Sequence, residues 1–143
     1  MATLTIQPDE TDSKDCFVGQ NSNTGIENDV NYNNTELRTQ YLDTPYARYA
    51  EFYMQFDLRG IPNGADVTAA TLTLECFAGQ PHPRPNQVHR IDEDWVETVP
   101  TWGVAGADRL SVADFITSTD VANPGTKTWD LLTAVQNWND GTW

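Results

Sequence analysis

Tyrosine is concentrated in one segment of the chain, TQYLDTPYARYAEFY, which covers residues 39 to 53. Exposed tyrosine and tryptophan rings can stack on sugar rings, and tyrosine and arginine are enriched where proteins meet partners. The sequence therefore predicts a surface that contacts a glycan or a protein partner through Tyr41, Tyr46, Arg48, Tyr49, Tyr53 and Trp143.

Carboxylates gather in two polar loops of the first thirty residues. Calcium is bound by several oxygen ligands from carboxylates and carbonyls, and such loops can supply them. No EF-hand pattern is present, so a structural calcium ion is a hypothesis that rests on these loops alone. Its candidate ligands are Asp9, Asp12, Asp15, Glu27 and Asp29, and no other cofactor is indicated.

Signatures of catalysis are absent from the sequence. It contains no GxSxG, HExxH, P-loop or GxGxxG pattern. The carboxylates of residues 92 to 97 could form the acid pair of a glycosidase, but they flank Trp95 and are more simply explained as solvated or capping groups. His82 and His89 are separated by a proline-rich turn, which disfavours a shared metal. We therefore expect a protein that is not an enzyme.

Charge excludes one large class of partners. The 143-residue chain has 8 Lys and Arg against 21 Asp and Glu, giving a net charge of −13. No basic footprint exists for a phosphate backbone, so we expect no nucleic-acid binding. No apolar run is long enough to cross a bilayer, so membrane insertion is not expected either. The length suits one domain, residues 1 to 143.

The N-terminus, MATLTIQPDE, lacks the basic and apolar regions of a secretory signal. Either a signal has been removed, or the protein reaches its site by another route, as phage virion proteins do when lysis releases them. The expected location is accordingly a virion or the extracellular space.

Alternating apolar residues predict two core strands on either side of a short joint. AEFYMQFDL places Phe52 and every second residue after it on one face, and TAATLTLECF does the same from Ala70 to Cys76. In the joint, IPNGAD, Pro62 fixes its own φ and Gly64 can supply a positive φ. The predicted core consists of Met54, Phe56, Leu58, Leu72 and Leu74 together with Trp138.

The remaining elements are shorter. ATLTIQP, CFVG, TELRTQYL and QVHRID are predicted strands, whereas residues 93 to 121 are expected to be mostly irregular and anchored by Trp95 and Trp102. The period changes near the end, where Leu131, Val135 and Trp138 predict one short helix over residues 130 to 139, with Asp130 at its start and Gly141 at its end. Together these elements indicate an all-β antiparallel β-sandwich, a jelly roll, with one short C-terminal helix.

The two cysteines, Cys16 and Cys76, are too few for a disulfide scaffold. Cys76 shares a face with Leu72 and Leu74, which favours a buried free thiol. A bridge between strands remains the alternative.

Three segments, in order between residues 56 and 138, resemble the motifs of DNRLRE-type modules. FDLRGIPNGADVTAATLTL is similar to their "FDLS-IP-GA-V-SA-L-L" segment, VHRIDEDWVETVPTW to "V-R-W-E-TW", and TWDLLTAVQNW to "DVT-AVQ-W". The resemblance implies a fold like that of jelly-roll carbohydrate-binding modules and a role without catalysis. It also implies that Trp95, Trp102, Trp129 and Trp138, which fall in these motifs, belong to the core.

Two functions follow as hypotheses. The first is a structural or interaction module of an extracellular assembly, such as a phage virion decoration or tail-associated protein, whose partners are other subunits of the same or different kind. The second is a carbohydrate-binding module cut from a larger secreted polysaccharide-active enzyme or adhesin, with a surface polysaccharide as partner.

The chain departs from the family pattern at its C-terminal end. Family members continue past the helix with "NYG" and an apolar strand, whereas this chain stops at GTW. A sandwich without its final strand exposes an unpaired edge. We expect a segment of another subunit to cover that edge. The alternative is that the N-terminal ATLTIQP strand shifts to cover it.

Overall fold

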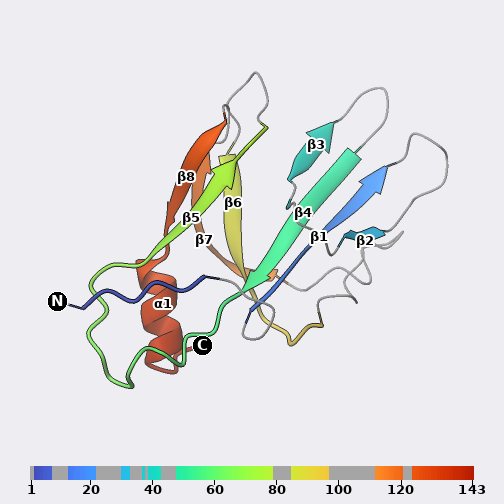
Figure 1. The fold of residues 1–143 in the computed structure, drawn as a ribbon. Helices are drawn as coiled ribbons and strands as arrows, with labels where there is room; N and C mark the ends of the chain where they lie inside the picture. Colours follow the sequence, from blue (N-terminus) through green and yellow to red (C-terminus); the bar gives the residue numbers. More distant parts are fainter. Residues whose placement is uncertain are drawn as a thin grey trace. The chain divides into compact units, whose positions relative to one another are not determined.

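The computed structural model describes residues 2–7, 13–21, 30–32, 37, 39–42, 48–78, 85–96, 112–120 and 124–143. Most of them form strands in antiparallel sheets, with one short helix (Figure 1), which confirms the all-β class predicted from the sequence. The elements are β1 (Lys14–Asn21), β2 (Val30–Tyr32), β3 (Gln40–Leu42), β4 (Arg48–Gln55), β5 (Thr71–Cys76), β6 (Pro85–Ile91), β7 (Val112–Asp120), β8 (Gly125–Asp130) and α1 (Leu132–Asn139).

The chain divides into two compact units. Unit 1 contains residues 1–57 and 93–111, and unit 2 contains residues 58–92 and 112–143. The first boundary falls inside the FDLRG sequence that leads from β4 into the joint. That the units together make the single domain expected from the sequence stays a prediction.

Unit 1 is built on one antiparallel sheet with the strand order β2-β1-β4-β3. Its core lies where Cys16 of β1 stands opposite Tyr53 of β4, and both side chains are buried. Trp95 completes this core, with its ring edge-on to that of Tyr53 at a centroid distance of 6.0 Å. Lys14 Nζ donates a hydrogen bond of 2.9 Å to the Trp95 carbonyl, which ties the segment after β6 to β1.

Burial in β4 differs from the prediction. The sequence pattern assigned the core to the face that carries Met54, yet Met54 is only half-buried and Tyr53, on the opposite face, is 4% exposed. The strand ends at Gln55, so Phe56 and Leu58 follow it and are also half-buried. A period of two separates the two faces of a strand but does not say which is covered more completely.

Unit 2 contains two antiparallel ladders, β5 with β8 and β6 with β7. Side chains of β5 alternate between exposed and half-buried, with Leu72, Leu74 and Cys76 on the inner face as predicted. The indole N–H of Trp129, in β8, donates to the Asn86 carbonyl of β6 at 3.2 Å, so one buried side chain links the two ladders. Trp129 and Trp95 are therefore core residues, as expected.

The joint between β4 and β5 consists of two tight turns. Ile61 N–H donates to the Leu58 carbonyl at 2.9 Å, and Ala65 N–H donates to the Pro62 carbonyl at 3.0 Å. Gly64 has a φ of 75°, as the third residue of a type II turn requires. The turns redirect the chain and leave the carbonyls after them facing α1.

Helix α1 is held against this joint by side-chain amides. Gln136 Nε2 donates to the Val67 carbonyl at 2.8 Å, and Asn139 Nδ2 donates to the Ala65 carbonyl at 3.2 Å. Ala134 is fully buried, which lets the helix approach closely. The predicted helix is confirmed, and the Asp130 carboxylate accepts the Leu132 N–H at 2.9 Å near its start.

Two predicted features are wrong. Trp138 does not belong to the core: it shares a helix face with the buried Ala134, but it lies at the end of α1 and is 39% exposed. Residues 2–7, the described part of the predicted ATLTIQP strand, form no strand, and Leu4 is exposed. An alternating pattern produces a strand only where another strand supplies hydrogen bonds, and among the described residues none pairs with this segment.

Both cysteines are free. Cys16 is buried in unit 1, and Cys76 is half-buried in unit 2, where its thiol lies 3.3 Å from the Ala78 carbonyl. Trp102 lies outside the described residues.

Candidate functional site

The backbone register places two of the predicted tyrosines at paired positions on neighbouring strands. Tyr41 of β3 and Tyr49 of β4 are direct partners in the antiparallel register, and Arg48 is the partner of Leu42. Tyr46 lies outside the described residues. These strand positions keep part of the predicted contact surface on neighbouring strands, and its role in binding stays a prediction.

Tyr53 has a different role from the one expected. Its ring is buried against Trp95, and its hydroxyl donates to Glu51 Oε1 at 2.6 Å. A buried ring cannot offer its face to a sugar or a partner, so Tyr53 is a core residue of unit 1. Its polar end finds a partner at the border of that core, which is how buried tyrosines are usually accommodated.

The calcium hypothesis stays a prediction. Asp9, Asp12, Glu27 and Asp29 lie outside the described residues. Asp15 is half-buried on β1, opposite Met54. Within the described ranges, no three His, Cys, Asp or Glu side chains lie close enough together to hold a metal ion.

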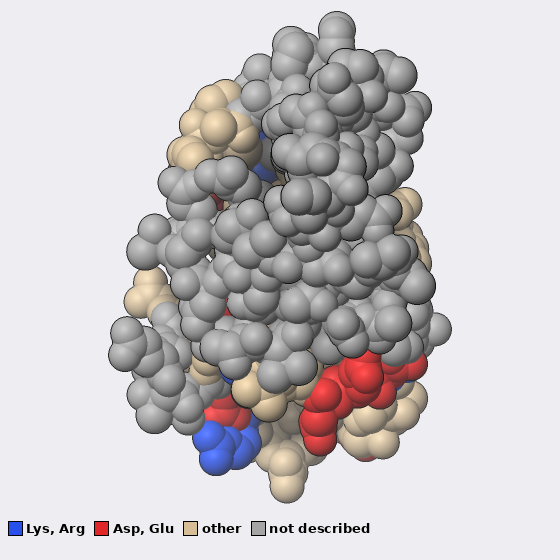
Figure 2. Space-filling model, turned by 90° about the vertical axis from the view of Figure 1, so that its right-hand side faces the viewer, with Lys and Arg blue, Asp and Glu red and all other residues tan. Residues whose placement is uncertain are grey.

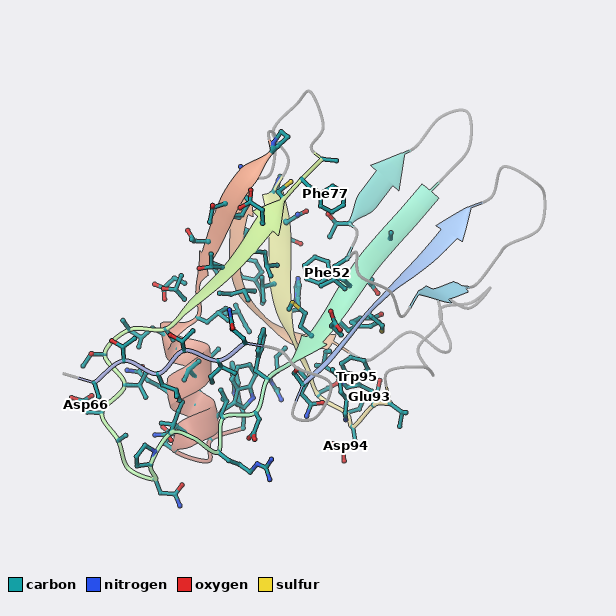
Figure 3. The ribbon with its side chains drawn as sticks, viewed as in Figure 1. Phe52, Asp66, Phe77, Glu93, Asp94 and Trp95 are labelled. Atoms are coloured by element: carbon teal, nitrogen blue, oxygen red, sulfur yellow. The ribbon has the colours of Figure 1, made fainter. Side chains whose placement is uncertain are left out.

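Carboxylates also lie next to Trp95 in the sequence. Asp92, Glu93 and Asp94 are all exposed, and Figure 3 shows Glu93 and Asp94 beside Trp95 on the segment that follows β6. Exposed carboxylates interact with water and with each other through a high dielectric. Their arrangement fits the solvated role that the sequence suggested.

An aromatic cluster lies at the end of α1 in unit 2. The rings of Trp138 and Trp143 meet edge-on, with centroids 5.4 Å apart and planes inclined by 74°. The guanidinium carbon of Arg90, from β6, lies 4.8 Å from the centroid of the Trp143 ring. Trp138 is 39% exposed and Trp143 is half-buried. We call Arg90, Trp138 and Trp143 the tryptophan cluster.

Backbone hydrogen bonds fix the position of Trp143. Gly141, with a φ of 77°, ends the helix in the left-handed conformation, and Thr142 N–H donates to the Asn137 carbonyl at 2.9 Å. This is the six-to-one bond of a Schellman motif. Trp143 N–H donates to the same carbonyl at 3.2 Å. The last turn thereby folds back and brings Trp143 to Trp138.

A carboxylate reinforces this turn. Asp140 Oδ1 accepts the Thr142 N–H at 2.9 Å. Hydrogen bonds from the Thr142 side chain and backbone lower the pKa of Asp140 below its ordinary value. The ionised Asp140 carboxylate therefore stabilises the turn at neutral pH, and this stabilisation is lost as pH falls through the lowered pKa of Asp140.

The tryptophan cluster can bind through its aromatic faces. Tryptophan offers a large apolar surface with few rotatable bonds, so little conformational entropy is lost on binding. Arg90 over Trp143 forms a cation–π pair that holds both groups in place. Sequence reasoning had singled out Trp143, had assigned Trp138 to the core and had not considered Arg90.

The described residues contain no helix long and apolar enough to span a membrane. In comparisons with protein-family models, curated proteins and solved structures, nothing matches the chain.

Proposed function

We propose that this chain is a non-catalytic interaction module of an extracellular assembly, of the kind that decorates a phage virion or joins its tail. In this proposal the antiparallel ladders form a jelly-roll sandwich, as in the DNRLRE-type modules that three of its segments resemble. The observation that carries the proposal is the tryptophan cluster, whose members are of the residue types that contribute most to binding at protein interfaces.

The exposure of Trp138 favours this role over a purely structural one. Trp138 leaves 39% of its surface in contact with water. A partner that covers this apolar surface removes it from water, which contributes favourable free energy to binding. Its edge-on contact with Trp143 restricts the ring before binding, which lowers the entropic cost.

The second candidate is a carbohydrate-binding module of a larger secreted enzyme or adhesin. It is supported by the same exposed indole, because sugar rings stack on tryptophan. The Tyr41–Tyr49 pair on neighbouring strands would be a further contact surface.

The test measures the size of the native particle that contains this protein. Native mass spectrometry of material purified from its source is expected to give a mass well above the 16.0 kDa of one chain. Recombinant Trp138→Ala is expected to lose at least about tenfold in association with the other subunits, because a central tryptophan contributes about 2 kcal/mol or more.

Phe77→Ala is the matched control, since Phe77 is an exposed aromatic residue of the same unit outside the tryptophan cluster (Figure 3). It is expected to associate normally, with both variants remaining folded at the temperature of the measurement. A single 16.0 kDa chain that is retarded in gels containing a polysaccharide, with Trp138→Ala no longer retarded, would replace the assembly proposal with the carbohydrate one.

A further inference from the structure

A hollow of about 320 Å³ lies in unit 2, where the β5–β8 ladder meets the start of α1. That volume is at the lower end of the range for ligand pockets. Its walls come from the segment before β5, from the end of β8 and from the start of α1: Thr68, Ala69, Ala70, Thr71, Thr128, Trp129, Asp130 and Leu132.

The polar groups of the hollow are hydroxyls and one carboxylate. Thr71 and Asp130 are direct partners in the β5–β8 register, so the carboxylate stands opposite a hydroxyl-bearing residue. No Lys or Arg is among the residues that line it. Ala69, Ala70, Trp129 and Leu132 supply its apolar lining. The hollow is therefore suited to a ligand that donates hydrogen bonds and carries positive charge.

Two hydrogen bonds fix this geometry. Leu132 N–H donates to Asp130 Oδ1 at 2.9 Å, and Leu131 N–H donates to the Ala70 carbonyl at 2.9 Å. An ionised carboxylate has about four acceptor positions, so one hydrogen bond leaves capacity for a ligand. Asp130 is therefore fixed in position and still has acceptor positions for hydrogen bonds from a ligand.

The outward face of the β5–β8 ladder also carries hydroxyl and acidic side chains. Thr71, Thr73 and Glu75 alternate outward along β5, and Glu75 accepts the Thr126 hydroxyl at 3.0 Å. The charged residues on this face are both acidic, because Lys127, the cation of the ladder, lies on the half-buried face. The net charge of the whole chain, −13, has the same sign.

We propose that this hollow receives an arginine side chain from a protein partner in the assembly; the inference rests on the proposed function. The guanidinium group presents five donors in a rigid fork that matches a carboxylate flanked by hydroxyls. Its aliphatic stem can lie along Ala69 and Ala70. A phosphate or another anion would be repelled by Asp130, and it would find no cation in the walls.

The experiment is an NMR titration of the full chain labelled with ¹⁵N. The probe is the capped peptide acetyl-Gly-Arg-Gly-amide, with acetyl-Gly-Gln-Gly-amide as the neutral reference. The arginine peptide is expected to shift the amide signals of Thr71, Asp130 and Leu132, and the glutamine peptide is not. Asp130→Asn should weaken arginine-peptide binding about tenfold, as expected for the loss of a charge-assisted hydrogen bond.

Asp92→Asn is the matched control, because Asp92 is an exposed carboxylate elsewhere in unit 2 and its loss changes the net charge equally. It is expected to leave binding unchanged. The asparagine oxygen in Asp130→Asn can still accept the Leu132 N–H, so the fold is retained. Should that variant unfold, Thr71→Val tests the hollow by removing a hydroxyl, and a several-fold loss of binding is expected.

Three results would overturn the inference: no shifts at the hollow, equal weakening by Asp92→Asn, or a neutral oligosaccharide that shifts these amides while the arginine peptide does not. Two further results distinguish a failure of the arginine site from a failure of the proposed function. If the chain assembles and Asp130→Asn assembles equally well, only the arginine site is wrong. If the peptide binds but the native mass is that of one chain, the assembly proposal is wrong.

Discussion

The described tryptophans differ in how their polar and apolar parts are used. Trp129 is buried, and its indole N–H donates to the Asn86 carbonyl, so both parts are satisfied inside unit 2. Trp95 is buried against Tyr53 in unit 1. Trp138 and Trp143 instead contact each other at the end of α1. The first two stabilise the fold, and the second two keep part of their aromatic surface accessible to solvent.

A prediction at this scale concerns the Tyr53 hydroxyl. Tyr53→Phe keeps the ring beside Trp95 but removes the hydrogen bond to Glu51, and we expect a loss of about 1–2 kcal/mol in the free energy of unfolding. Urea denaturation measures it. Glu51→Gln, which keeps an acceptor oxygen, should lose less. If Tyr53→Phe unfolds at the same urea concentration as the parent, the hydroxyl contributes nothing through Glu51.

Among the residues of the candidate site, sequence reasoning found Trp143 but missed Arg90. Trp143 has no place in an alternating or helical pattern, so it was open to a surface role. Arg90 lies on β6, a strand that the sequence does predict, but the ring beside it comes from residue 143. A contact over that separation depends on how the helix end folds back, which no local pattern records.

At the scale of the elements, the sequence predicted those with regular patterns. β5 alternates strictly between threonine or glutamate and apolar residues, and α1 changes period where the helix begins. β8, GTKTWD, went unrecognised because its half-buried positions hold Gly125 and Lys127 before Trp129. Alternation can be recognised only when the inward residues are apolar.

β7 went unrecognised for a related reason. Its sequence, VADFITSTD, lies in a stretch that was expected to be mostly irregular. Phe115 is exposed and packs edge-on against His89, its register partner in β6, with centroids 5.6 Å apart. The ladder with β6 also contains register irregularities on either side of His89. β7 is therefore recognised from its pairing with β6 and not from an alternating pattern in its own sequence.

The joint before β5 gives a prediction at this scale. Gly64 has a φ of 75°, and nothing lies within 4 Å of the position that a Cβ would take. Gly64→Ala should therefore cost about 1–2 kcal/mol through backbone strain alone. Thermal unfolding measures the loss. Asparagine tolerates this conformation better than alanine, so Gly64→Asn should lose less; an alanine variant as stable as the parent would show that the turn relaxes to another form.

On the scale of the whole molecule, acidic groups dominate the charge. Among the described residues visible in Figure 2, the red surface of Asp and Glu is larger than the blue surface of Lys and Arg. With a net charge of −13, association with a basic partner should be fast at low salt and slower as salt screens it. The carboxylate of the proposed arginine site agrees with this, whereas the tryptophan cluster contains a cation, Arg90, and relies on its aromatic surface instead.

The last prediction concerns whether the two units fold together. Each unit is roughly half of the 143-residue chain, and domains of that size usually bury too little apolar surface to be stable alone without disulfides or metals. The two cysteines are free, so no cross-link supports either unit. If the chain is one jelly-roll domain, as proposed, both units should therefore unfold in a single transition.

Native-state hydrogen exchange can test this unit by unit. The slowest amides of β1 and β4, in unit 1, should report the same free energy of opening as those of β5 and β8, in unit 2. Urea unfolding followed by tryptophan fluorescence and by far-UV circular dichroism should give coincident curves. Two free energies that differ by several kcal/mol, or two separate transitions, would show that the units are independent. The resemblance to a single jelly-roll module would then no longer describe this chain, because such a module has one core that both halves of the sequence must build together.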